Sequence, residues 1–145
     1  MKTTMLIPFT AGALVLAVGL AATRADDADA SPNTAQLPPP STRRGVTYAA
    51  DIKTIFDHSC VKCHSGRKPK GHLKLDTLAD ALKGGKDGKV ILPGDSAKSM
   101  LILNVAHLSK DHMDWMPPLH NKAGIKPLTP EQISLLRAWI DQGAK

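Results

Sequence analysis

The chain has 145 residues, a length that fits a single domain. Its 19 basic and 13 acidic residues give a formal net charge of +6, and this mild excess argues against a nucleic-acid-binding protein, which needs a denser basic face. Aromatic residues make up only 3% of the chain, so we expect part of the core volume to come from something other than large side chains.

Residues 1–25 have the parts of a secretory signal peptide in their usual order. A lysine at position 2 is followed by an apolar run over residues 5–20 and then by small residues. We expect cleavage after Ala22 or Ala25 and a periplasmic or otherwise exported protein, whose net charge falls to about +4. The alternative is an uncleaved membrane anchor, for which the run is short, because a bilayer span needs about 20 residues.

Residues 26–44 contain Leu37 as their only sizeable apolar residue and three consecutive prolines. Such a segment cannot bury enough apolar surface to offset the entropy of ordering it. We therefore predict a disordered Pro-rich tether over 26–44 and a folded domain over 45–145.

Apolar residues of this domain recur at helical spacing and predict an all-α fold. A first helix starts near Tyr48 and leads into Cys60, and a second spans 77–85. A third is expected over 96–108, capped by Asp95, with Met100 as a core residue.

The last helix has the clearest signals. Thr129 and Gln132 form a capping box with Pro130 at the first helical position, and Gly143 marks the end. Its expected buried face consists of Ile133, Leu136, Trp139 and Ile140. An N-terminal and a C-terminal helix can then cross and pack together.

Both cysteines lie in CVKCH, residues 60–64, which admits four interpretations. A disulfide across two intervening residues would constrain the unfolded chain very little. A thioredoxin-like dithiol needs a βαβ setting that the sequence does not suggest. A zinc site needs further ligands, and His107 and His112 lie far along the chain.

The fourth interpretation, covalent attachment of a c-type haem, is the one that uses His64. Thiols three positions apart on one helical turn can form thioethers with the two haem vinyl groups. The histidine after the second cysteine can then bind the iron as its proximal ligand. An export signal agrees with this chemistry, so we predict one haem c held by Cys60, Cys63 and His64.

The distal iron ligand is predicted to be Met116. Pro117 and Pro118 follow it and stiffen the chain in an extended conformation, which reduces the entropy lost in holding a thioether against a metal. Met113 and His120 lie nearby and are the alternatives. Trp115 can pack on the haem or in the core, and we assign no role to His72 or His107.

Together these segments make the chain resemble the class I cytochrome c fold and, more closely, the planctomycete-type cytochrome c domain. The resemblance rests on CVKCH with the residues that follow it, then ILPGDSAKSMLI, MPP and LTPEQISLLRAWIDQGA, in that order. It implies one covalent haem at Cys60 and Cys63, His64 as proximal ligand and Met116 as distal ligand.

The predicted function is that of a monomeric one-electron carrier rather than an enzyme. Basic residues near the attachment motif can dock an acidic patch of a redox partner protein; they are Lys53, Lys62, Arg67, Lys68 and Lys70. One alternative is a haem enzyme or gas sensor with an open sixth site. Another is a haem-bearing interaction module of a larger redox complex.

Overall fold

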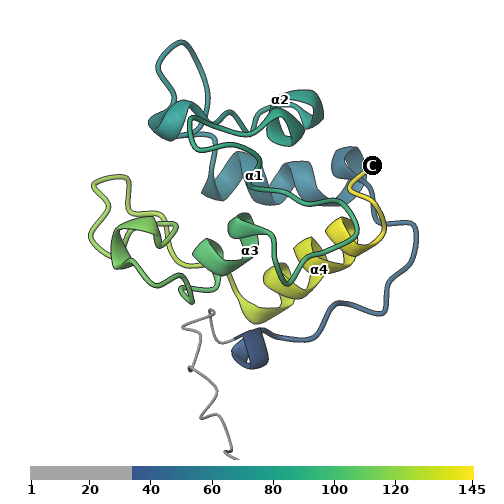
Figure 1. Ribbon diagram of the computed structural model, residues 1–145. Helices are drawn as coiled ribbons and strands as arrows, with labels where there is room; N and C mark the ends of the chain where they lie inside the picture. Colours follow the sequence, from purple (N-terminus) through teal and green to yellow (C-terminus); the bar gives the residue numbers. More distant parts are fainter. Residues whose placement is uncertain (1–33) are drawn as a thin grey trace, which may run out of the picture.

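The computed structural model describes residues 34–145 (Figure 1). The expected signal peptide and the first part of the expected tether, residues 26–33, lie outside this range. Throughout the described range the regular secondary structure is helical, without a strand. The prediction of an all-α domain is confirmed.

The helices are short and joined by long turns. The α-helices are α1 (Lys53–Ser59), α2 (Leu78–Lys83), α3 (Met100–Val105) and α4 (Pro130–Asp141). A π-helical segment, η2 (Tyr48–Ile52), runs directly into α1, and the 3-10 turns are η1 (Thr34–Gln36), η3 (Lys70–His72) and η4 (His112–Asp114). In Figure 1, α1 and α4 occupy the middle of the molecule, and the long loop between α3 and α4 projects to one side.

The N-terminal and C-terminal helices meet through three aromatic rings. Tyr48 and Phe56 contact Trp139 at centroid distances of 6.2 and 6.1 Å, and all three side chains are buried. The amide of Tyr48 also donates to the carbonyl of Lys145 at 2.7 Å. This packing fixes the helix that precedes Cys60 against the end of the chain.

Helix α4 forms as the sequence predicts. Gln132 N donates to Thr129 Oγ1 at 3.3 Å and Thr129 N donates to Gln132 Oε1 at 2.9 Å, which completes the capping box. Gly143 has a φ of +99° and lets the chain turn away after the helix. The predicted buried face is confirmed at all its positions, which are Ile133, Leu136, Trp139 and Ile140.

Helix α3 is shorter than predicted. It begins at Met100 rather than at Ser96, because Ser99 hydrogen-bonds locally: its hydroxyl accepts from Leu92 N at 2.9 Å and donates to Asp95 O at 2.8 Å. The prediction that Met100 is a core residue is wrong, since it is 44% exposed at the start of the helix. The core side chains of α3 are Leu101, Ile102, Leu103 and Val105.

The chain before the domain lies along α4 from residue 37 onward (Figure 1). We call residues 37–43 the N-terminal strap. Leu37 is buried, Ser41 N donates to Ser134 O at 2.9 Å, and the Arg137 guanidinium donates to the carbonyl of Pro38. These residues of the expected tether are therefore in contact with the helical domain.

Candidate functional site

The CVKCH segment forms a tight turn at the end of α1. Cys60 N donates to Phe56 O at 2.8 Å, and His64 N donates to Cys60 O at 3.0 Å. Cys60 packs against the hydrophobic core, and burial raises the pKa of its thiol to about 12. Both cysteines are free thiols, so they form no disulfide with each other.

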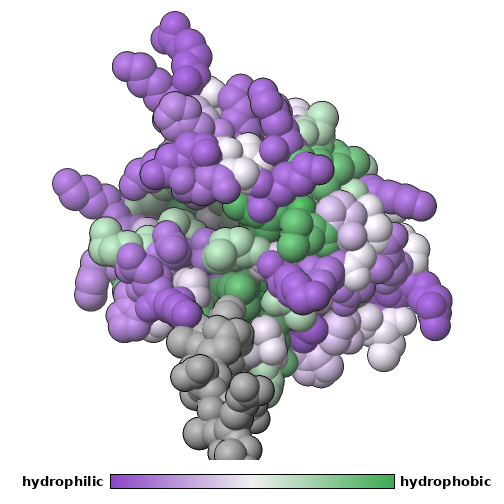
Figure 2. All heavy atoms as spheres, viewed as in Figure 1, coloured by the Kyte–Doolittle hydropathy of each residue, from purple (hydrophilic) through white to green (hydrophobic). Residues whose placement is uncertain are grey.

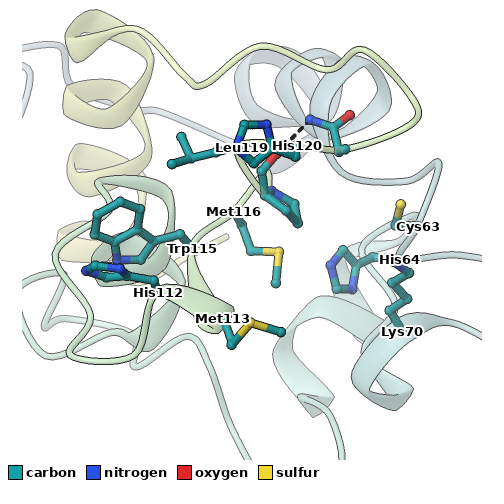
Figure 3. Close-up of a pocket in the computed structure, with 11 residues that line it drawn as sticks. Cys63, His64, Lys70, His112, Met113, Trp115, Met116, Leu119 and His120 are labelled. Carbon is teal, nitrogen blue, oxygen red and sulfur yellow. Dashed lines mark hydrogen bonds between the residues drawn. The ribbon is translucent and has the colours of Figure 1, made fainter.

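A cavity of about 460 Å³ opens beside this turn, a volume in the range of small-molecule and cofactor sites. One wall comes from the residues around CVKCH and the other from the loop between α3 and α4 (Figure 3). The lining residues are Cys63, His64, Lys70, His112, Met113, Trp115, Met116, Pro118, Leu119, His120 and Asn121. In Figure 2 hydrophobic side chains are exposed in the middle of the face, with hydrophilic side chains around them.

A second, smaller cavity of about 70 Å³ lies further inside. Its walls are apolar except at His64 and Asn104, and the other lining residues are Leu73, Leu75, Val90, Leu101 and Met116. His64 and Met116 line both cavities.

The side chains of His64 and Met116 point toward one another from opposite walls (Figure 3). Met116 packs against the core, and its amide donates to Asn104 O at 3.0 Å. Met113 and His120, the two alternatives for the distal ligand, line the outer cavity. Met113 is 81% exposed, whereas Met116 is partly buried, so the two methionines differ in how firmly they are held.

The surroundings of His64 favour its neutral imidazole. Burial lowers its pKa, and the nearby Lys70 ammonium acts in the same direction, while backbone groups of Leu73 and Lys70 oppose the change. Its Nδ1 is buried without a hydrogen-bond partner among the described residues. A neutral imidazole keeps a ring-nitrogen lone pair free, which is the form that binds metals.

Trp115 is held beside Met116 by two histidines and a hydrogen bond. Its ring stacks on that of His107 with centroids 4.9 Å apart and planes at 5°, and His112 packs on it at 4.1 Å. Its Nε1–H donates to Ser109 O at 3.1 Å. His107, to which we had assigned no role, is therefore part of the wall that carries Met116.

Basic side chains surround an adjoining cavity of about 490 Å³ that shares Cys63 and Lys70 with the main one. Lys62, Lys122 and His120 also line it. Of the five basic residues expected around the site, Lys62 and Lys70 lie here, and Lys53 instead pairs with Asp57 at 2.7 Å. Lys122 comes from the loop after Pro118 and was not among those predicted.

Residues 60–120 match the family model described as planctomycete cytochrome C. This match confirms the resemblance to the planctomycete-type cytochrome c domain. The matched range includes CVKCH and the residues that line the outer and inner cavities, except Asn121. Cys60, Cys63 and His64 fit the CxxCH pattern within the matched residues. Neither a curated protein nor a solved structure shows a significant match to the chain.

None of the helices within residues 34–145 combines the length and the apolar character needed to cross a bilayer. In the same range, no three side chains of His, Cys, Asp or Glu gather where they could hold a metal ion.

Proposed function

We propose that this protein is an exported mono-haem c-type cytochrome that carries single electrons between partner proteins. The observation that supports it most directly is the placement of His64 and Met116 on opposite walls of one cavity. That cavity lies beside Cys63, within the segment that matches planctomycete cytochrome C.

The residues around the cavity fit a haem c. Cys60 and Cys63 would hold it through thioethers, with His64 as the proximal and Met116 as the distal iron ligand. When bound, the haem supplies an iron that takes up and gives off one electron. The unpaired, buried Nδ1 of His64 and the apolar walls of the inner cavity agree with a group that fills this space.

The residues of the protein affect the site in three ways. Burial keeps the imidazole of His64 neutral. Trp115 and Pro118 stiffen the wall that carries the Met116 thioether, and apolar residues exclude water. Phe56 and Trp139 fix the helix that carries the attachment motif. In this proposal the domain is a class I cytochrome c fold that wraps around one haem.

The redox partner would dock at the basic cavity through an acidic patch. Lys62, Lys70 and Lys122 lie around one opening next to Cys63, where a haem thioether would form. Attraction between opposite charges speeds encounter and orients the partner, and salt weakens it. We further propose that residues 1–25 direct export, and that the mature protein is a monomer that meets the membrane only if this segment stays uncleaved.

A haem enzyme or gas sensor with an open sixth site is a second candidate. His112 supports it, because its ring is held against Trp115 and lines the same cavity as His64. In that case Met116 would not bind the iron, and His112 would stand beside the open position as an acid–base group.

Visible spectroscopy separates the two candidates. The full chain is produced in a host with c-haem attachment machinery, and spectra are recorded oxidised, reduced, and reduced under carbon monoxide. We expect low-spin iron with the weak red iron–sulfur band in the oxidised form, and a reduced spectrum that the gas leaves unchanged. High-spin iron that binds carbon monoxide would favour the enzyme or sensor, and a chain without covalent haem would contradict both.

A further inference from the structure

A further hollow of about 500 Å³ adjoins the basic cavity beside Cys63, and the two share Lys62 and Ala123. It lies between the end of α1 and the segment that leads into α4, and His58 and Lys126 line it from these two sides. Neither of these two side chains has a role in the proposed function. We call the two hollows together the basic surface.

The ionised side chains that line the basic surface are all lysines. They are Lys62, Lys70, Lys122 and Lys126. Within residues 34–145 no aspartate or glutamate lines either hollow. All four lysines are exposed, and none takes part in an ion pair with another described residue. Their positive charge is therefore available to attract an acidic partner.

One wall of the basic surface is a loop that the side chain of Asn121 closes. Its Nδ2 donates to Pro118 O and to Ile125 O, each at 2.8 Å, and its Oδ1 accepts from Ile125 N at 2.8 Å. The carboxamide therefore uses both its donors and its oxygen within the loop. Lys122 lies between the bonded residues, so its backbone is held in place before a partner binds. Such preorganisation lowers the entropy lost on binding.

We propose that the basic surface binds an extended acidic segment of the redox partner protein. This inference rests on the proposed function, to which it adds the shape of the partner's docking element and a contact at Lys126. A compact acidic patch needs only the cavity beside Cys63, whereas two adjoining hollows lined by lysines favour an elongated element. In an extended chain the side chains at i and i+2 project to the same side, so carboxylates at alternate positions can reach both hollows.

The experiment measures the affinity of the full chain for hexaglutamate, a peptide that spans about 20 Å when extended, by NMR amide shifts. We expect Lys62→Gln, Lys122→Gln and Lys126→Gln each to weaken binding about two- to threefold, as for the loss of one exposed ion pair. The matched control is Lys89→Gln, which removes an exposed lysine outside both hollows. It should change the affinity less than about 1.5-fold at an ionic strength of about 0.1 M, where distant charges are screened.

A variant of Asn121 tests whether the loop must be held in shape. Asn121→Ala keeps every lysine and loses the three side-chain hydrogen bonds, so we expect hexaglutamate to bind at least about twofold more weakly. Leu37→Ala, in the N-terminal strap, is the control for a general loss of stability and should leave the affinity unchanged. An unchanged affinity in Asn121→Ala overturns the role given to this loop, and if that variant does not fold, the three lysine variants still decide the proposal.

The outcomes separate this inference from the proposed function. Weaker binding in Lys62→Gln and Lys122→Gln but not in Lys126→Gln confines docking to the cavity beside Cys63 and overturns this inference alone. Anionic lipid vesicles that bind the full chain when hexaglutamate does not would overturn it too. The visible spectrum of the same preparations tests the proposed function independently, since a chain without covalent haem contradicts that function however tightly the peptide binds.

Discussion

The rings of Phe56 and Trp139 meet edge to face, with centroids 6.1 Å apart and planes at 88°. Phe56 lies in the last turn of α1, and its carbonyl accepts the amide of Cys60. Trp139 lies in α4, near the end of the chain. The position of the attachment motif therefore depends on packing against residues about 80 positions later.

Truncating Trp139 should destabilise the whole domain. The side chain is fully buried and its Nε1–H donates to Lys145 O at 3.0 Å, so Trp139→Ala leaves a large cavity and removes one of the hydrogen bonds to that carbonyl. The carbonyl of Lys145 still accepts from Tyr48 N, so the cavity accounts for most of the effect, and we expect a loss of about 3–5 kcal/mol in the free energy of unfolding, measured with urea. Leu119→Ala, at a position 62% exposed, should change it by less than about 0.5 kcal/mol; equal effects would contradict the packing described here.

Met116 and Met113 should respond differently to truncation. Met116→Ala should abolish the iron–sulfur band, allow carbon monoxide to bind the reduced protein and lower the reduction potential, because a methionine sulfur raises it. Met113→Ala should leave all three readings unchanged. The opposite pattern would assign the distal position to Met113. No change in either variant would favour His120 as the distal ligand.

The two cysteines should act together in retaining the haem. Either Cys60→Ser or Cys63→Ser alone leaves one thioether, so the protein should keep its haem after denaturation. The double variant should lose it. Mass spectrometry of the denatured protein gives the result directly, and haem retained by the double variant would contradict covalent attachment at these residues.

The N-terminal strap should contribute to stability although it precedes the domain predicted from the sequence. Leu37 is 7% exposed, and Leu37→Ala is expected to cost about 2 kcal/mol, the lower end for a buried leucine. Thr42→Ala, at an exposed position of the same segment, is the control. Identical urea midpoints for the two variants would mean that the strap does not hold to α4 in solution.

The basic cavity should govern electron exchange with charged reagents. Oxidation of the reduced protein by ferricyanide, an anion, should slow by about tenfold in the double variant Lys62→Glu, Lys122→Glu at low ionic strength, because charge steers encounter. Oxidation by a cationic cobalt complex should become faster, and high salt should remove both effects. Lys86→Glu, in the turn after α2, is the control that should change neither rate.

Much of the helical frame could be predicted because its signals are local. The capping box at Thr129 and Gln132 and the spacing of Ile133, Leu136, Trp139 and Ile140 depend on residues within one helix. The start of α3 could not be predicted, since Ser99 hydrogen-bonds to the backbone of Leu92 and Asp95, and these bonds compete with the helix. The prediction that Met100 lies in the core was wrong for the same reason, because the helix begins at this residue and leaves it exposed.

Some residues of the candidate site could likewise be predicted from local signals, and others could not. CVKCH places Cys60, Cys63 and His64 by sequence alone, and the two prolines single out Met116. Asn104, His107 and Lys122 are brought to the site by the fold, and no spacing relates them to Cys63 in the sequence. In the case of Asn104, a single polar residue within an apolar helix was the one signal available.

The burial of Cys60 affects when a haem could be joined to its thiol. In the folded chain its thiol packs against the core and has a pKa of about 12, so at neutral pH it is almost wholly protonated and a poor nucleophile. Cys63, in contrast, lines the cavity. Under the proposed function, the bond between the haem and Cys60 would then form early in folding, before the Cys60 thiol is packed against the core.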